Sequence, residues 1–355
     1  MIGAWGWRLA AVVGVTLLGF SLTAGAAAAD APKVQTGQVR TGQVRTRQGA
    51  VEGIEAKGMQ EFLGIPYAAP PVGDLRWRPP AQPAPWSGVL KAARFGPACA
   101  QVTTLGVFAG PANANEDCLT LNVTTPRLGA AAKLPVIVWI HGGGNVDGVS
   151  SDYDASRLAS LGQAVIVTIN YRLGLFGWMA NPALDAEGHP FADYGLLDQL
   201  AALKWVKDNI SGFGGDPGNV TLGGQSAGSV DAEALVASPL AAGLFQRAIF
   251  QSIVVDGAPL TVAEKQGADF AEAAGCGRGS TPEVAACLRR LPAEAVMKLQ
   301  GTESASAPFV TFLTADGQIV PAGGLFAAFR SGHFNRMPIM SGSVHDEQNF
   351  SAAIA

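Results

Sequence analysis

The sequence predicts an α/β protein with a mostly parallel central sheet and helices on both faces. Short apolar runs of buried-strand type alternate with segments whose apolar residues recur at helical spacing. The chain has 355 residues, of which 48% are hydrophobic and only 15% charged, so it is long and apolar enough for a large core. No linker or shift in composition divides residues 49–355, which we expect to form one domain.

The expected elements follow one another in alternating order. Strands are predicted at 119–123, 134–140, 164–169, 220–222, 248–250 and 336–340. Helices are predicted at 195–206, at 231–237 and, in several pieces, between 263 and 299. The proline-rich stretch 64–80 is expected to be irregular, because proline interrupts helices and donates no ladder hydrogen bond.

The first 29 residues are expected to be a signal peptide. Arg8 is followed by an apolar run from Leu9 to Thr23, and three alanines at 27–29 suit cleavage before Asp30. A membrane anchor is the alternative, but the apolar run is short for a membrane span. We therefore expect a secreted or periplasmic protein with no stable membrane insertion after cleavage. Residues 30–48, which contain a TGQVR duplication, are expected to be a flexible leader.

Four cysteines form two local pairs in the sequence, Cys99 with Cys118 and Cys276 with Cys287. In an oxidising compartment this pattern predicts two disulfides, although three pairings are formally possible. A metal site is the alternative, but there is no C-x₂-C pair and no histidine near either pair, so we expect no metal. The net charge of −4 provides no basic surface for nucleic acid, which is not an expected partner.

The chemistry centres on Gly-Gln-Ser-Ala-Gly at 224–228. A strand before it and a helix after it predict a sharp turn that presents the Ser226 hydroxyl beside backbone N–H groups. The strand 134–140 ends in His-Gly-Gly-Gly at 141–144, whose N–H groups can approach an oxyanion closely. A glycine triplet alone is more often a flexible turn. Together with the serine turn it predicts an acyl-transfer site.

Several ordered stretches resemble the type-B carboxylesterases, the family of cholinesterases and para-nitrobenzyl esterases. The matching stretches are GIPYAAPPVG at 64–73, EDCLTLN at 116–122, NYRLGLFG at 170–177, YGLLDQ at 194–199 and FGGDP at 213–217. The resemblance implies one α/β-hydrolase domain that hydrolyses small-molecule carboxylic esters without metal or cofactor.

The resemblance also implies roles for individual residues. Ser226 is the expected nucleophile, and Gly143, Gly144 and Ala227 are expected to offer the oxyanion N–H groups. The pairs Cys99–Cys118 and Cys276–Cys287 match the two local disulfides of the family. The triad acid is expected at Glu347, where it would orient and stabilise the imidazole. Asp346 is the alternative acid, and a solvated loop carboxylate is the plainer interpretation of Glu347.

The sequence departs from the family pattern at several positions. Gln225 stands where Glu is common, and Asn145 stands where many members have Phe. The loop between Cys99 and Cys118 contains no Trp, so the cation–π platform for choline esters is missing and these substrates are not expected.

The position of the histidines is the largest departure. The family order is serine, acid, histidine, yet no histidine follows Glu347, and the histidines present are His141, His189, His333 and His345. A triad of Ser226, Asp316 and His345 has the right order, but both later segments match family stretches with other roles. We therefore expect a chain truncated at its C-terminus, without the closing strands and the histidine loop, which is an inactive fragment or an incomplete record.

Three functions are compatible with these residues. The first is a serine esterase that acts through an acyl-enzyme on small or medium carboxylic esters. The second is a non-catalytic binding or adhesion protein on the same scaffold, which the presence of Ser226 and the oxyanion glycines disfavours. The third is a hydrolase of amides, carbamates or lactones, which stays open because a nucleophile and an oxyanion hole serve any acyl transfer.

Overall fold

The computed structural model describes residues 42–103, 109–188, 191–252, 255–300, 309–310 and 312–347. Residues 39–355 form one compact unit. The expected signal peptide at 1–29 and the leader up to residue 41 lie outside the described residues, so both stay predictions. None of the helices in the described ranges combines the length and the apolar character of a membrane span.

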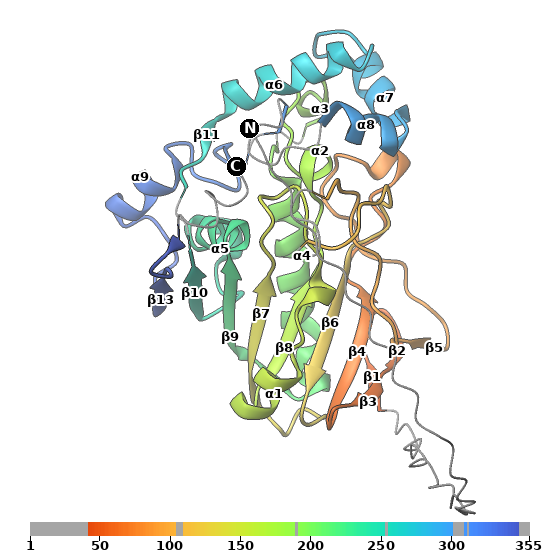
Figure 1. Cartoon of the computed structure of the whole chain (residues 1–355), viewed down its shortest axis with the longest axis vertical. Coiled ribbons are helices and arrows are strands. Elements are labelled where there is room, and N and C mark those ends of the chain that lie inside the picture. The colour runs from red at the N-terminus through yellow and green to blue at the C-terminus, as the bar shows by residue number, and fades with distance from the viewer. Residues whose placement is uncertain are drawn as a thin grey trace, which may run out of the picture. The chain divides into compact units, whose positions relative to one another are not determined.

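An eight-stranded mixed sheet organises the fold, in the order β13-β10-β9-β7-β8-β6-β4-β3 (Figure 1). The strands from β13 to β8 pair in parallel, whereas β8, β6, β4 and β3 pair antiparallel. The strands are β3 (Ile54–Ala56), β4 (Met59–Pro66), β6 (Thr120–Thr125), β7 (Leu134–Ile140), β8 (Val165–Ile169), β9 (Gly215–Gln225), β10 (Arg247–Gln251) and β13 (Ile339–Gly342). The predicted α/β class is confirmed.

Helices cover both faces of this sheet. The connection from β7 to β8 through α1 (Ser156–Gly162) runs across the sheet in the opposite direction to the next two connections, which contain α4 (Tyr194–Asn209) and α5 (Ala227–Ala237). Because parallel crossovers are right-handed, α1 lies on one face and α4 and α5 lie on the other. Every residue of α5 is buried, and the helix contacts β7, β9 and β10. The predicted alternation of strands and helices is therefore observed.

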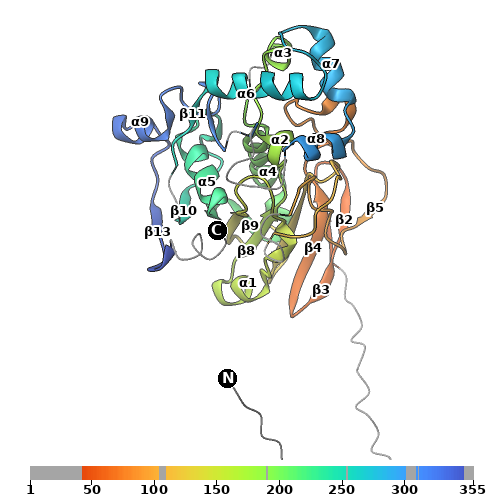
Figure 2. The same cartoon turned by 45° about the horizontal axis from the view of Figure 1, so that its top comes forward.

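Smaller elements complete the domain. The remaining helices are α2 (Gly174–Gly177), α3 (Pro182–Asp185), α6 (Leu260–Ala273), α7 (Pro282–Arg290), α8 (Ala293–Gln300) and α9 (Gly324–Ser331). Two small sheets consist of β1 (Gln43–Arg45), β2 (Ala50–Glu52) and β5 (Val89–Lys91), and of β11 (Ala258–Pro259) and β12 (Thr314–Ala315). In both views α3, α6 and α7 gather at one end of the large sheet (Figures 1 and 2).

Several element boundaries differ from the sequence-based expectation, and three of these differences are informative. Strand β4 continues to Pro66, into the stretch expected to be irregular, because an irregular register between Phe62 and Ile65 accommodates the left-handed Gly64. The last strand begins at Ile339 and not at residue 336, since Pro338 has no N–H and contributes only its carbonyl, which accepts from the Ala248 N–H. Strand β1 lies inside the expected leader, so the packed part of the domain begins before residue 49.

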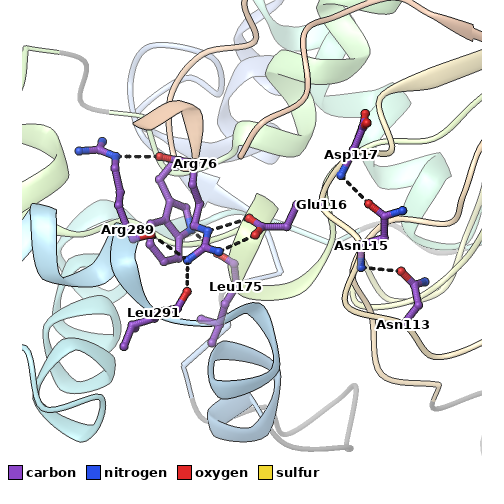
Figure 3. A network of polar contacts seen from close by, with 9 residues as sticks. Arg76, Asn113, Asn115, Glu116, Asp117, Leu175, Arg289 and Leu291 are labelled. Atoms are coloured by element: carbon purple, nitrogen blue, oxygen red, sulfur yellow. Dashed lines mark hydrogen bonds and ion pairs between the residues drawn. The ribbon is translucent and has the colours of Figure 1, made fainter. Parts of the chain in front are cut away.

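A buried ion pair ties the two disulfide regions together (Figure 3). The disulfides Cys99–Cys118 and Cys276–Cys287 are both formed, as predicted. Arg76 donates two hydrogen bonds to the carboxylate of Glu116, which lies two residues before Cys118. It donates a third to the carbonyl of Leu291, the residue directly after α7, and α7 contains Cys287. Arg289 of α7 donates back to the carbonyl of Arg76. Charge-assisted bidentate bonds of this kind hold two loops in a defined geometry.

Candidate active site

Ser226 lies in the sharp turn between β9 and α5. Its backbone has φ 55° and ψ −125°, a sparsely populated conformation for a residue other than glycine. A Cβ atom on Gly224 would lie 2.1 Å from the carbonyl oxygen of Gly228, and a Cβ on Gly228 would lie 2.3 Å from that of Ile140. The two flanking glycines are therefore required by close backbone approach. The Ser226 N–H donates to the carbonyl of Gln251 on the neighbouring strand at 2.9 Å.

The glycine loop after β7 lies against this turn. Strands β7 and β9 are parallel neighbours with Ile140 opposite Gly224, so their carboxyl ends meet at the same sheet edge. A Cβ on Gly142 would lie 3.1 Å from the Ser226 Cβ. Gly143 has φ +115°, and a Cβ there would lie 2.0 Å from the carbonyl oxygen of Asp147. Only glycine fits this position.

The expected oxyanion residues therefore come together at one sheet edge. Gly143 and Gly144 lie in the loop beside Ser226, and Ala227 is the first residue of α5. The N-terminus of a helix carries free N–H groups and partial positive charge, which suits a developing negative charge. Asn145, one of the departures noted above, has a left-handed φ of 59°, which Asn tolerates better than bulky residues.

Glu347 lies in the same cleft as Ser226. One of its carboxylate oxygens accepts hydrogen bonds of 3.0 Å from the Ser252 hydroxyl and from the Val344 N–H. Asp346, the alternative acid, lines the same cleft, but it is exposed and pairs with the neighbouring His345 at 3.0 Å. The hydrogen bonds that fix a carboxylate at the cleft therefore favour Glu347 over Asp346.

The described histidines make no hydrogen bond with Ser226 or Glu347. His141 is buried, stacks on Tyr171 with ring centroids 4.5 Å apart, and contacts the Gly142 carbonyl through Nδ1 at 2.8 Å. Burial lowers the pKa of His141 to about 4, so the ring is neutral. His333 is exposed, the side chain of His345 is 97% exposed, and His189 lies outside the described residues.

The alternative triad of Ser226, Asp316 and His345 is not assembled. One carboxylate oxygen of Asp316 accepts three backbone N–H groups, from residues 318, 319 and 320, and so closes its own turn. His345 points instead to Asp346. Asp316 is absent from the described lining of the cleft that contains Ser226. Its role here is local and structural.

The cleft has a volume of about 920 Å³ and a mixed lining. Val149, Phe250 and Met340 provide apolar surface, whereas Asp152, Asp346 and Glu347 provide carboxylates. Within the described ranges no group of three or more His, Cys, Asp or Glu side chains could hold a metal ion. The arrangement can accept an ester beside a hydroxyl nucleophile and present N–H donors to its carbonyl oxygen.

Two polar residues around the site were not anticipated from the sequence. Asp231 lies within α5, five residues after Ser226, and Ser252 follows β10. An acid inside a helix that otherwise consists largely of Ala, Val, Leu and Gly was the available signal for Asp231. Ser252 carried no such signal, because its position against Glu347 arises from a contact between residues 95 apart in the chain.

The comparisons with known proteins identify one family. The profile of the Carboxylesterase family matches residues 40–355. The chain is similar to a medium-chain fatty acyl-CoA hydrolase precursor of Anas platyrhynchos, with 44% identity over 68% of this chain and 46% of that protein. It is also similar to fumonisin B1 esterase of Sphingopyxis macrogoltabida, with 40% identity over 85% of this chain and 55% of that protein. The chain thus spans about half the length of these relatives.

Solved structures lead to the same family. A PNB esterase superposes with a TM-score of 0.78 at 35% identity, covering 87% of this chain and 64% of the other. A carboxylesterase of Geobacillus stearothermophilus superposes with a TM-score of 0.75 at 35% identity, covering 88% and 63%. The α/β-hydrolase fold expected from the sequence is therefore confirmed, and the chain belongs to the carboxylesterase family.

Proposed function

We propose that this protein hydrolyses carboxylic esters of small molecules, with Ser226 as the nucleophile. The observation that carries the proposal is the close approach of the strained serine turn and the glycine loop, where a Cβ added to Gly142 would lie only 3.1 Å from the Ser226 Cβ. The identity to esterases of 40–44% over most of this chain supports the same reaction type. Two independent sequence segments thus meet where an acyl group would react.

The proposed reaction proceeds through an acyl-enzyme. The Ser226 oxygen attacks the ester carbonyl carbon, and the carbonyl oxygen becomes an oxyanion that accepts N–H bonds from Gly143, Gly144 and Ala227. Collapse of this intermediate expels the alcohol, which takes up the proton that the Ser226 hydroxyl gave up, and leaves the acyl group on Ser226. Water then attacks the acyl-enzyme through a second oxyanion; one of its protons returns to the Ser226 oxygen as the acid is released. An oxyanion donor typically accelerates such reactions about 10²- to 10³-fold.

Glu347 is the proposed triad acid. The Ser252 and Val344 bonds fix one of its carboxylate oxygens in the cleft, which is what an acid that orients an imidazole requires. No described histidine contacts Glu347 or Ser226, so the proposal assigns the general base to no described residue. Oxyanion stabilisation and binding alone retain roughly 10³-fold acceleration over water when a triad member is missing.

The proposed substrates are small or medium carboxylic esters. The cleft has room for both an acyl and an alcohol group, and Val149, Phe250 and Met340 offer them apolar surface. A bacterial relative, 45% identical over 63% of this chain, is named for para-nitrobenzyl esters, which combine these properties. The same site would also serve amides, carbamates or lactones, but every relative cited here is named for an ester or thioester.

We also propose that the protein works outside the cytoplasm after export by a signal peptide ending at residue 29. The two disulfides support this location, since disulfides persist in oxidising compartments. N-terminal sequencing of the exported protein is expected to begin at Asp30. A protein retained in the cytoplasm with residues 1–29 attached would contradict the proposal.

Hydrolysis of p-nitrophenyl acetate and butyrate by the full chain tests the proposed function. Wild type is expected to exceed the uncatalysed rate about 10³-fold. Ser226→Ala is expected to lose the burst of p-nitrophenol that accompanies acylation. Ser229→Ala, three residues along the same helix and with a buried hydroxyl, is the matched control and should retain it. A burst that survives Ser226→Ala would contradict the proposal.

A further inference from the structure

Asn145 anchors the end of the glycine loop inside the protein. Its side chain is fully buried, and its backbone carbonyl accepts from the Gly174 N–H at 2.7 Å. The Asn145 side-chain amide donates to the Asp231 carboxylate at 3.0 Å and to the Phe312 carbonyl at 3.2 Å. The loop that is expected to stabilise the oxyanion is therefore bonded directly to α5, the helix that follows Ser226.

Asp231 extends this connection to a second helix and back to the start of the loop. Its other carboxylate oxygen accepts from the Gln199 side-chain amide of α4 at 2.6 Å. The Tyr171 hydroxyl lies 3.2 Å from the Asn145 side-chain oxygen and 2.9 Å from the carbonyl of His141. The network thus reaches both His141, the first residue of the His-Gly-Gly-Gly loop, and Asn145, the residue directly after this loop.

Helix packing alone does not explain a carboxylate at position 231, because its burial carries an unfavourable desolvation free energy. Asp231 is fully buried, and the charged form is stabilised by two amide hydrogen bonds, with no ion pair to a described Lys or Arg. Burial raises the pKa of Asp231 to about 7, against which the bonds from Asn145 and Gln199 act. An apolar residue would pack there without this desolvation cost. The presence of the carboxylate is explained if its hydrogen bonds to Asn145 and Gln199 hold the surrounding elements in place.

We propose that Asp231 is a positioning residue, which locks the glycine loop to α5 through Asn145 so that the oxyanion N–H groups stay aligned with Ser226. This inference rests on the proposed function of those N–H groups. Because both oxygens of Asp231 accept amide donors, Leu at this position leaves both donors without their acceptor. Loss of the pairing frees the loop relative to the helix without removing any group that touches substrate.

Three variants and one control test the pairing in the full chain. Asp231→Leu removes both acceptor oxygens and Asn145→Asp places two carboxylates against each other, whereas the double variant Asn145→Asp with Asp231→Asn again places a donor opposite an acceptor. Glu233→Gln is the matched control, because it removes another buried carboxylate of α5 whose Oε2 has no hydrogen-bond partner. The readouts are the rate at which a small phosphonofluoridate labels Ser226 and the amide exchange of residues 141–149, with thermal unfolding recorded alongside.

Each single variant is expected to slow labelling and to speed amide exchange in the loop by about tenfold, the effect of losing a hydrogen bond to a charged group. The exchanged pair should recover part of this loss through the re-formed hydrogen bond, although position 145 then no longer donates to the Phe312 carbonyl, and Glu233→Gln should leave both values unchanged. A purely structural role predicts that the single variants lower thermal stability while the folded proteins keep the wild-type rates of labelling and loop exchange. The proposal is overturned if folded Asp231→Leu behaves like Glu233→Gln, or if the folded double variant stays as impaired as the single variants. If wild type does not react with the probe, the proposed function fails, and amide exchange alone decides this inference.

Discussion

Replacement of Gly228 by alanine tests whether the serine turn depends on close backbone packing. The added Cβ would lie 2.3 Å from the carbonyl oxygen of Ile140 and 2.6 Å from that of His141. Both neighbours are backbone atoms at the end of β7, so no side chain can rotate away. The start of α5 must therefore move by about 1 Å from the strand that carries the glycine loop to restore an ordinary contact.

The cost follows from this displacement. Overpacking of a tight site typically costs about 1–3 kcal/mol. For a domain of this size each kcal/mol lowers the melting temperature by roughly 2–3 °C, so Gly228→Ala is expected to melt about 2–9 °C below wild type. A shift of about 1 Å at a reacting group can also cost roughly 10²-fold in rate, which predicts a comparable loss of Ser226 labelling.

Calorimetry and labelling kinetics measure the two effects, with Gly162→Ala as the matched control. At Gly162, which ends α1, an added Cβ would meet only the Ala164 Cβ at 3.7 Å, an ordinary contact. This control should melt within about 1 °C of wild type, as surface substitutions usually do. The reasoning is refuted if Gly228→Ala melts with the control and labels Ser226 at the wild-type rate.

Three further predictions concern stability. Burial raises the pKa of Glu233 from its ordinary 4.5 to about 7, so the unfolded chain releases this proton at a lower pH than the folded protein does. The free energy of unfolding is therefore expected to fall as the pH rises from about 4.5 to 7. In urea unfolding, Glu233→Gln should show a smaller fall over this range, and a pH profile identical to that of wild type would contradict the prediction. Arg172→Met leaves the buried Asp198 carboxylate without the two side-chain hydrogen bonds that Arg172 donates to it. This variant should lower the free energy of unfolding in urea by about 3–5 kcal/mol. Adding Asp198→Leu should recover most of this loss, and a failure to recover it would indicate that lost packing is the cause. The Cys276–Cys287 disulfide spans 11 residues, and its removal should lower the free energy of unfolding, measured by calorimetry, by about 2–3 kcal/mol. An unchanged melting temperature would show that other contacts hold the loop.

The alternation of apolar runs was sufficient to predict the α/β class and most elements of the sheet. The limits of β7 were predicted to the residue, because its seven residues form one apolar run between polar or glycine-rich neighbours. Strand β13 was displaced, since the register beside Pro338 depends on a partner strand about 90 residues earlier. Local pattern thus predicts which segments are strands better than where each one starts.

In the candidate site, too, the features with a local sequence pattern could be predicted, whereas contacts between distant residues could not. The serine turn and the glycine loop could be expected to meet, because the carboxyl ends of adjacent parallel strands share one sheet edge. The bond between Asn145 and Asp231 joins residues 86 apart, and the bond between Ser252 and Glu347 joins residues 95 apart. Such polar pairs have no local signature, so only the three-dimensional structure reveals them.

Ser226 is expected to react as a nucleophile beside the glycine loop. Treatment of the full chain with a phosphonofluoridate, followed by peptide mass spectrometry, measures this reaction. We expect one adduct, on Ser226, which disappears in Ser226→Ala and persists in Ser229→Ala. A folded protein that gains no adduct, or one that is modified at another serine, would show that Ser226 is not the nucleophile.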